Sequence, residues 1–190
     1  MEKILFDYIE NYIQLSDAEK QIITDLSLIK PYKRGSVLLE EGKKSNDSYF
    51  VLKGCLRCYY LKDGEEKTTE FYTELQSLSP LCVLDGSSSQ YYISCVEDTV
   101  LLVSNPEAEQ EAFAKFPKFE MMCRVLSEKL AAKIQIDFDN FKTSNPEERY
   151  LSLLEIRPQL LQRVPQHQLA SYLGITPQSL SRLRGRLIRK

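Results

Sequence analysis

Residues 166–184 read "QHQLASYLGITPQSLSRLR", and this stretch predicts a short helix followed by a tight turn. Leu169, Ala170 and Leu173 have the spacing that places apolar side chains on one face of a helix. Gly174 follows, where the end of a helix favours a residue that tolerates positive φ. The small side chain of Ala170 would allow a second helix to cross closely.

The second half of the same stretch carries the signals of a helix start. Thr176 can cap a helix, and Pro177 suits the first helical turn. The next leucines, Leu180, Leu183 and Leu187, would face back onto the first helix. Two short helices with this spacing are typical of a helix-turn-helix, whose second helix enters the major groove of DNA.

The side chains left on the outside of the second helix are polar or basic. Gln178, Ser181 and Arg182 share its outward face, because residues 178 and 182 are four apart. A recognition helix meets base edges with this face; arginine pairs with guanine and glutamine with adenine. The predicted phosphate contacts are Ser179, Arg184, Arg186, Arg189 and Lys190. A purely structural helical hairpin, the alternative, would not require a wholly basic outer face.

The charge of the chain is distributed unevenly. The 190 residues carry a formal net charge of −2, but residues 163–190 contain five arginines, one lysine and no acidic residue. This segment therefore carries +6 and residues 1–162 carry −8. An acidic body with one basic end indicates a polyanionic partner at that end only.

The N-terminal part of the chain changes from helical to strand-like patterns. Helices are predicted to about Leu28, with Ser16 and Glu19 forming a capping box. Asp63-Gly64, between two strand-like runs, is a strong hairpin signal. Many short strands with frequent turns favour a sandwich or a barrel. The strand-like runs are "YKRGSVLLEEG", "DSYFVLKGCLRCYYL", "EKTTEFYTEL", "SQYYISCVE" and "DTVLLVS".

From Asn105-Pro106 to about Lys142 the pattern is helical, and Pro117 suits the first position of a long helix. Its apolar stripe could pack on its own domain or form the seam of a dimer. The stripe comprises Phe119, Cys123, Leu126, Leu130, Ile134, Phe138 and Phe141. A further helix is predicted after Asn145 as its cap and Pro146 in its first turn.

Taken together, these patterns resemble the Crp/Fnr family of bacterial transcription regulators. The resemblance rests on residues 166–184 and on the glycine-punctuated "RGSVLLEEG" and "DSYFVLKGCLRCYY". It implies an α+β fold with a jelly-roll-like double-stranded β-roll sensor domain over 1–112 and a dimerisation helix over 113–142. The helix-turn-helix domain would span 143–190 and lack an extended wing. By resemblance, Gln178, Ser179 and Arg182 lie where the family places DNA contacts.

The effector site departs from the family's cyclic-AMP cassette, which has a Gly-Glu pair and then an Arg-Ser/Thr pair that grips the phosphate. Glu74 can stand for the glutamate, but Thr73 replaces the glycine, and Ser89 and Gln90 fall where Arg-Ser belongs. No arginine occurs between Arg57 and Arg124. A buried phosphate without a cation is costly. We therefore expect weak or no cyclic-nucleotide binding, which leaves another small organic ligand in the roll or no ligand.

Several other functions are disfavoured. The only histidine, His167, lies outside the roll, so a cupin-like metal enzyme is excluded, and no catalytic motif is present. Cys55 and Cys58 would point to opposite faces of one strand, so we expect packing rather than metal or redox chemistry. No cofactor is expected. Without a signal peptide or an apolar run of roughly 20 residues, we expect a cytoplasmic protein that does not enter the membrane.

The sequence thus predicts a homodimeric regulator that is not an enzyme and that binds an inverted-repeat site in double-stranded DNA. A regulator that works without any effector is one alternative. A sensor module that acts through an acidic protein partner is the other.

Overall fold

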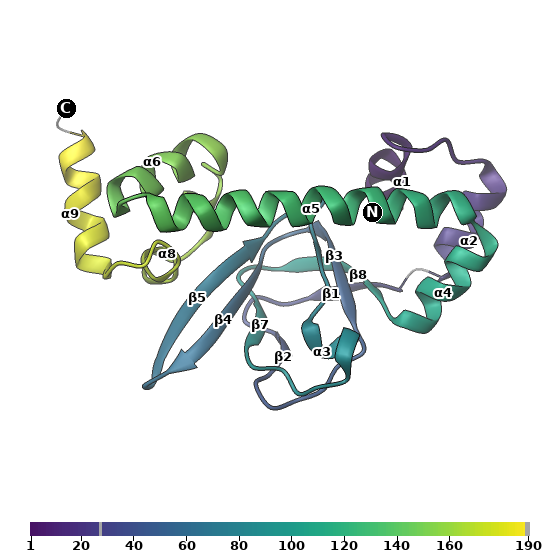
Figure 1. Ribbon diagram of the computed structural model, residues 1–190, viewed down its shortest axis with the longest axis horizontal. Helices are drawn as coiled ribbons and strands as arrows, with labels where there is room; N and C mark the ends of the chain where they lie inside the picture. Colours follow the sequence, from purple (N-terminus) through teal and green to yellow (C-terminus); the bar gives the residue numbers. More distant parts are fainter. Residues whose placement is uncertain (27, 189–190) are drawn as a thin grey trace.

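A computed structural model describes residues 1–26 and 28–188 (Figure 1). The helices are α1 Glu2–Glu10, α2 Asp17–Leu26, α3 Leu81–Asp85, α4 Pro106–Lys115, α5 Pro117–Thr143, α6 Pro146–Ile156, α7 Leu160–Arg163, α8 Gln166–Tyr172 and α9 Pro177–Ile188. The strands are β1 Leu28–Tyr32, β2 Val37–Leu39, β3 Ser48–Lys53, β4 Leu56–Lys62, β5 Glu65–Tyr72, β6 Ser77–Leu78, β7 Tyr92–Cys95 and β8 Thr99–Ser104. No described helix is long and apolar enough to cross a membrane.

The strands form a β-roll of two four-stranded sheets, in the orders β1-β8-β3-β6 and β2-β7-β4-β5. Their facing sides enclose an apolar core in which Val51, Leu56, Ile93 and Leu101 are all 0% exposed. Alternating side chains along each strand place these residues inside, as expected for two sheets packed face to face. The α+β prediction with an N-terminal β-roll is confirmed.

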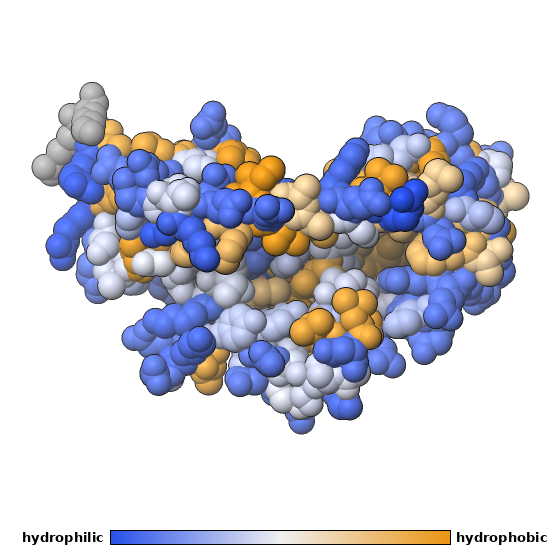
Figure 2. All heavy atoms as spheres, in the orientation of Figure 1, coloured by the Kyte–Doolittle hydropathy of each residue, from blue (hydrophilic) through white to orange (hydrophobic). Residues whose placement is uncertain are grey.

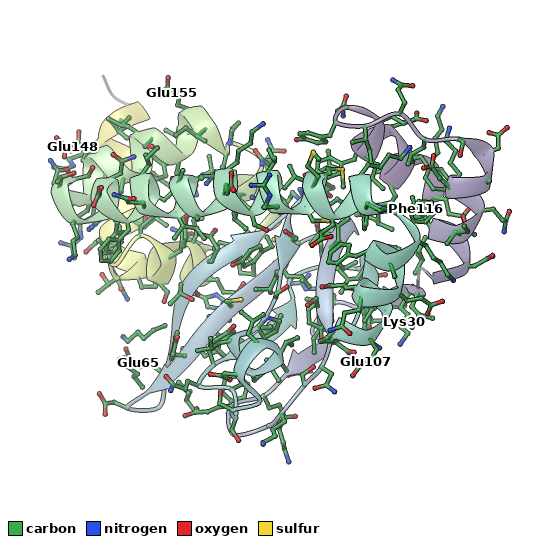
Figure 3. All side chains as sticks on the ribbon, turned by 45° about the vertical axis from the view of Figure 1, so that its right-hand side comes forward. Lys30, Glu65, Glu107, Phe116, Glu148 and Glu155 are labelled. Carbon is green, nitrogen blue, oxygen red and sulfur yellow. The ribbon has the colours of Figure 1, made fainter. Side chains whose placement is uncertain are left out.

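The β4–β5 hairpin turns where the sequence predicts it. Asp63 and Gly64 both have positive φ, 53° and 78°. A type I′ turn requires positive φ at both of its central residues, which Asp and Gly tolerate. The flanking residues Lys62 and Glu65 pair directly, and Glu65 lies at the tip of the hairpin (Figure 3).

The sequence patterns do not predict strand β1 and instead indicate helix to about Leu28. In the structure, β1 begins at Leu28, and Leu28 pairs with Val103 of β8. Pro31 lies within β1, which is tolerated because β1 is the edge strand of its sheet. The pairing partner lies far along the chain, so local patterns do not reveal it. Ser16 and Glu19 do form the predicted capping box.

Helix α5 crosses the whole molecule, with α1, α2 and α4 at one end and α6 to α9 at the other (Figure 1). Pro117 occupies its first turn, as predicted. Phe116, which is buried, joins α4 to α5 (Figure 3). The expected dimerisation segment, 113–142, therefore covers the end of α4 and nearly all of α5.

The apolar stripe of α5 divides into two halves. Phe119, Cys123 and Leu126 pack against α1 and the outer face of the β1-β8-β3-β6 sheet, where Leu5 and Leu52 are buried. The second half is exposed, and the space-filling view shows apolar side chains along this part of the helix (Figure 2). The exposed members are Leu130, Ile134, Phe138 and Phe141, and their exposed fractions run from 39% to 57%.

Helix α6 begins as predicted. The side chain of Asn145 accepts hydrogen bonds from the amides of Glu147 and Glu148, and the carboxylate of Glu148 accepts one from the Asn145 amide. Pro146 follows in the first turn. This reciprocal capping fixes the direction of the chain as it enters the C-terminal helices.

Candidate nucleic-acid interface

Helices α8 and α9 pack through a small apolar core. Leu169, Ala170, Leu180 and Leu183 are all buried, and Ala170 is 0% exposed. Because Ala170 has only a methyl side chain, the two helices can approach closely at this point. The predicted helix pair is confirmed.

The turn between these helices is a Schellman motif. Gly174 has φ of 72°, and its amide donates to the Ser171 carbonyl at 3.0 Å. The Ile175 amide donates to the Ala170 carbonyl, also at 3.0 Å. These two bonds satisfy carbonyls that the end of α8 would otherwise leave unpaired. Thr176 then caps α9, because its hydroxyl accepts the Ser179 amide at 3.2 Å.

The outward face of α9 is open. Gln178, Ser179, Ser181 and Arg182 are exposed, and Arg184 is half-buried. Glutamine and arginine four residues apart on an exposed helix can donate and accept hydrogen bonds at neighbouring base edges. The structure thus brings the predicted base-contacting residues together on one accessible helix.

The tail cations have different surroundings. Arg186 is 69% exposed and lies 3.4 Å from the carboxylate of Glu147 on α6. An exposed pair of this kind contributes little to stability, so Arg186 can exchange it for a phosphate. Arg189, Lys190 and the predicted absence of a wing fall outside the described residues.

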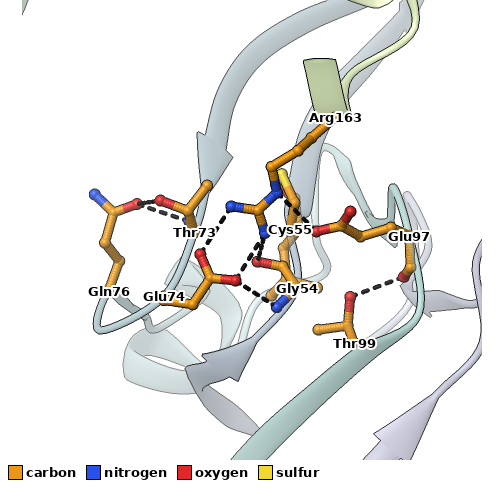
Figure 4. A network of polar contacts seen from close by, with 9 residues as sticks. Gly54, Cys55, Thr73, Glu74, Gln76, Glu97, Thr99 and Arg163 are labelled. Atoms are coloured by element: carbon orange, nitrogen blue, oxygen red, sulfur yellow. Dashed lines mark hydrogen bonds and ion pairs between the residues drawn. The ribbon is translucent and has the colours of Figure 1, made fainter. Parts of the chain in front are cut away.

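Arg163, which the sequence analysis counted in the charge of the basic segment 163–190, does not face outward with the exposed cations of that segment. Its guanidinium lies against the roll, where Nη1 and Nη2 donate to the two carboxylate oxygens of Glu74, both at 2.8 Å (Figure 4). Nε donates to Glu97 at 2.9 Å and Nη2 to the Gly54 carbonyl at 2.8 Å. We call these four residues the Arg163 cluster.

The predicted effector residues have separate surroundings in the structure. Glu74 lies in the turn between β5 and β6, and it also accepts the Gly54 amide at 2.8 Å. Ser89 is buried in the loop before β7, where its hydroxyl donates to the Tyr91 carbonyl and its amide to the Lys43 carbonyl. Gln90 is exposed. Among the described residues, Glu74 and Ser89 share no hydrogen-bond partner.

The partners of Glu74 stabilise the charged form of its carboxylate. Burial disfavours its charged form, but the bonds from Arg163 and from the Gly54 amide outweigh burial and lower the pKa of Glu74. The bonds to Glu74 in turn raise the pKa of Arg163, against the effect of burial. Both groups are therefore ionised at neutral pH, and Glu74 already has a cation bound to it.

Comparisons with known proteins agree with this architecture. Residues 29–116 match the family profile described as "Cyclic nucleotide-binding domain". The regulator CLP of Xanthomonas campestris, described as c-di-GMP responsive, has a TM-score of 0.70 at 14% identity and covers 92% of each chain. FixK2 of Bradyrhizobium japonicum has a TM-score of 0.68 at 19% identity, covering 86% of this chain and 85% of that one.

The catabolite activator protein of Thermus thermophilus, at 21% identity, has a TM-score of 0.53 and covers 94% of this chain and 86% of that one. No curated protein sequence matches the chain. This chain has the Crp/Fnr fold. Its residues 29–116 are similar to a cyclic nucleotide-binding domain, and the resemblance seen in the sequence is confirmed.

The cysteines of the chain pack as apolar side chains. Cys58 lies in the core of the roll, whereas Cys55 packs with residues of α6 to α8. The two thiols of the C-x-x-C therefore diverge, as predicted. Burial raises the pKa of Cys55 to about 12 and raises that of Cys58 as well, so neither is a ready nucleophile or metal ligand.

A cavity of about 230 Å³ lies where α8 meets the outer face of the β2-β7-β4-β5 sheet of the roll. Arg57, which is 3% exposed, lines it and donates to Thr68 at 2.8 Å and to Glu66. Gln168 lines it from α8, and its buried Oε1 has no protein partner among the described residues.

The sequence analysis missed the contacts that join the C-terminal helices to the roll. Besides the Arg163 cluster, Arg157 donates to Glu70 at 2.7 Å and to the Phe71 carbonyl. The available signal was the position of Arg163, which lies well before the other tail arginines in a largely apolar run. Its partners lie in distant loops of the roll, so spacing alone could not reveal them.

Proposed function

We propose that the protein is a homodimeric, sequence-specific DNA-binding transcription regulator of the cytoplasm, without enzymatic activity of its own. The observation that carries the proposal is the exposed face of α9, where Gln178, Ser181 and Arg182 are free of the roll. The Crp/Fnr fold of the chain supports it, since CLP is itself described as a global regulator.

In this function, α9 enters the major groove. Arg182 would donate two hydrogen bonds to guanine, and Gln178 would pair with adenine. Ser179, Arg184, Arg186 and Arg189 would contact phosphates, which provide affinity and register without sequence information. The acidic remainder of the chain repels DNA, so contact would be confined to this end.

The exposed half of α5 supports a dimer. Leu130, Ile134 and Phe138 form an apolar seam that a second copy related by two-fold symmetry would cover. Two α9 helices would then enter successive major grooves about 34 Å apart and read an inverted repeat.

An effector, if the roll takes one, would be a small organic ligand other than a cyclic nucleotide. The segment between Arg57 and Arg124 offers no arginine for a phosphate, and Glu74 already binds Arg163. Such a ligand could regulate DNA binding only by favouring one arrangement of the dimer over another. Calorimetry with cyclic AMP tests this part: saturable binding in the micromolar range would contradict it.

Selection of bound sequences from a random pool of double-stranded DNA tests the main proposal. We expect an enriched inverted repeat whose half-sites are one helical turn apart, and binding that weakens as salt rises. Retention that depends on salt but enriches no sequence would contradict specific recognition. Absence of DNA retention would favour the sensor module that acts through an acidic protein partner.

A further inference from the structure

The C-terminal helices are joined to the β-roll by a polar contact at α7. In the Arg163 cluster, one guanidinium binds two carboxylates, Glu74 and Glu97, and one carbonyl, that of Gly54 (Figure 4). The pair with Glu74 is bidentate, which fixes the direction of the arginine as well as its position. The Arg163 side chain is only 21% exposed, so this contact is partly shielded from water.

A second polar contact lies on the same side of the roll. The Thr68 amide of β5 donates to the Ser171 hydroxyl of α8 at 2.9 Å, and that hydroxyl donates to the Glu66 carbonyl at 3.0 Å. Through the Ser171 side chain, helix α8 thus forms hydrogen bonds with backbone groups at the edge of β5, where a neighbouring strand could otherwise pair. Figure 1 shows α8 beside β5.

Apolar packing connects these two contacts. Cys55 and Phe71 of the roll share one buried cluster with Leu153 and Leu160 of α6 and α7. The ring of Tyr172 on α8 lies against Phe71 with 5.3 Å between centroids. The C-terminal helices are therefore docked on the roll over a continuous surface, with Arg163 at its polar margin.

Arg163 lies only three residues before α8, and buried Val164 and the fixed φ of Pro165 leave little freedom between them. Helix α8 packs directly on α9 through Ala170 and Leu180. By holding α7 on the roll, Arg163 therefore fixes the orientation of α8, and through α8 the orientation of the recognition helix α9, relative to the roll.

We propose that Arg163 is a positioning residue for DNA binding: by holding α7 on Glu74 and Glu97, it orients α9 so that both helices of a dimer can meet their half-sites together. This inference rests on the proposed function. The docked arrangement leaves Gln178 and Arg182 exposed, so docking and DNA contact are compatible.

The physical reason is preorganisation. A C-terminal unit that moves freely on the roll must be ordered when the second half-site binds, and that ordering costs conformational entropy. A docked unit has lost this freedom beforehand, so the second half-site is met at a higher effective concentration. The Arg163 cluster should therefore affect binding to two half-sites and leave binding to one half-site unchanged.

The test compares the full-length wild-type protein with Arg163→Ala, Arg163→Lys and the control Arg124→Ala. Arg124 is an exposed arginine of α5 that forms a local ion pair with Glu128. Arg124→Ala therefore removes one positive charge, as Arg163→Ala does. Affinities are measured for the selected inverted repeat and for a duplex that holds one half-site. We expect Arg163→Ala to weaken binding to the inverted repeat by roughly tenfold and binding to the half-site by less than twofold.

Arg163→Lys should recover only part of the loss, because lysine keeps the charge but cannot form the forked bond to Glu74. The control should bind both duplexes as the wild type does. An equal loss on both duplexes, or no loss on the inverted repeat, would overturn the assignment of Arg163 as a positioning residue. A gain in affinity would also overturn it, since docking would then inhibit binding.

Amide hydrogen exchange on the same variants, without DNA, separates this inference from the proposed function. The amides of Gly54 and Thr68 donate to Glu74 and Ser171, so Arg163→Ala should increase their exchange while the Val51 amide in the core stays protected. Unchanged exchange at both amides would contradict the inference that Arg163 holds the C-terminal helices on the roll, even if the protein binds DNA. If wild type binds no DNA while these amides respond as expected, the proposed function fails and the docking contact remains.

Discussion

The guanidinium of Arg149 stacks on the ring of Phe141, 4.3 Å from its centroid, and donates to the Phe141 carbonyl at 3.1 Å. This pair joins the first turn of α6 to the last turn of α5. Gly174 lies against it, since a Cβ on Gly174 would be 3.5 Å from the Phe141 ring. The end of the long helix therefore contacts the turn that sets the angle between α8 and α9.

Gly174→Ala should destabilise the protein by roughly 1–2 kcal/mol, because alanine is strained at a φ of 72°. Space is not the reason, since a contact of 3.5 Å is ordinary. Urea unfolding measures the change. The control is Gly185→Ala, where the backbone is helical and the added Cβ meets nothing within 4 Å; it should stabilise by about 0.5–1 kcal/mol. Equal effects of the two substitutions would contradict the strain argument.

Arg182→Ala should remove discrimination at one base position, at a cost of roughly 1–3 kcal/mol, because Arg182 is the exposed arginine on the reading face of α9. Arg184→Ala, the control, should weaken all sequences alike and reduce the salt slope by about one. Binding assays on a panel of single-base variants of the selected site measure both. Specificity that survives Arg182→Ala would show that another face of α9 reads the bases.

Local chemistry was predictable from the sequence, and long-range contacts were not. The Asp63-Gly64 turn, the Asn145 cap and the αL conformation of Gly174 each depend on residues within a few positions, so their patterns are visible in the chain. Arg163 and Glu74 are 89 residues apart. Their pairing depends on how the C-terminal helices dock, which no local period encodes. For the same reason, the charge of Arg163 was counted with that of the basic segment 163–190.

Phe138→Glu should convert the proposed dimer to a monomer, because it places a charge in the exposed apolar half of α5. Sedimentation velocity measures the mass in solution. Gln135→Glu adds the same charge at a neighbouring exposed position outside the apolar stripe, and should leave the dimer intact. If wild type is already monomeric at micromolar concentration, α5 is not the dimer seam.

The native thiols should react slowly with a disulfide reagent at pH 8. Burial raises the pKa of Cys55 to about 12 and that of Cys95 to about 11, so little thiolate is present. Cys123 is only partly buried and should react first, although burial raises its pKa to about 11 as well. All five should react at once in urea. If Cys55 or Cys58 reacts in the native protein as fast as free cysteine, the prediction that the C-x-x-C has no redox role would be contradicted.

Acid should weaken the contact between α7 and the roll. The pKa of Glu74 is lowered in the fold, so its contribution to stability is complete above the ordinary glutamate pKa of about 4.3 and is lost as the pH falls through the depressed value. Arg163, whose pKa is raised, stays charged throughout. The gap in unfolding free energy between wild type and Glu74→Gln should be constant near neutral pH and shrink below about pH 4.3.

Urea unfolding across pH 3 to 7 measures this gap. Glu155→Gln, on the exposed surface of α6, is the control for loss of one carboxylate and should follow wild type at each pH (Figure 3). A gap for Glu74→Gln that does not change with pH would mean that the carboxylate charge does not stabilise the docked arrangement. The bond from the Gly54 amide, which the glutamine side chain can still accept, would then account for what Glu74 contributes.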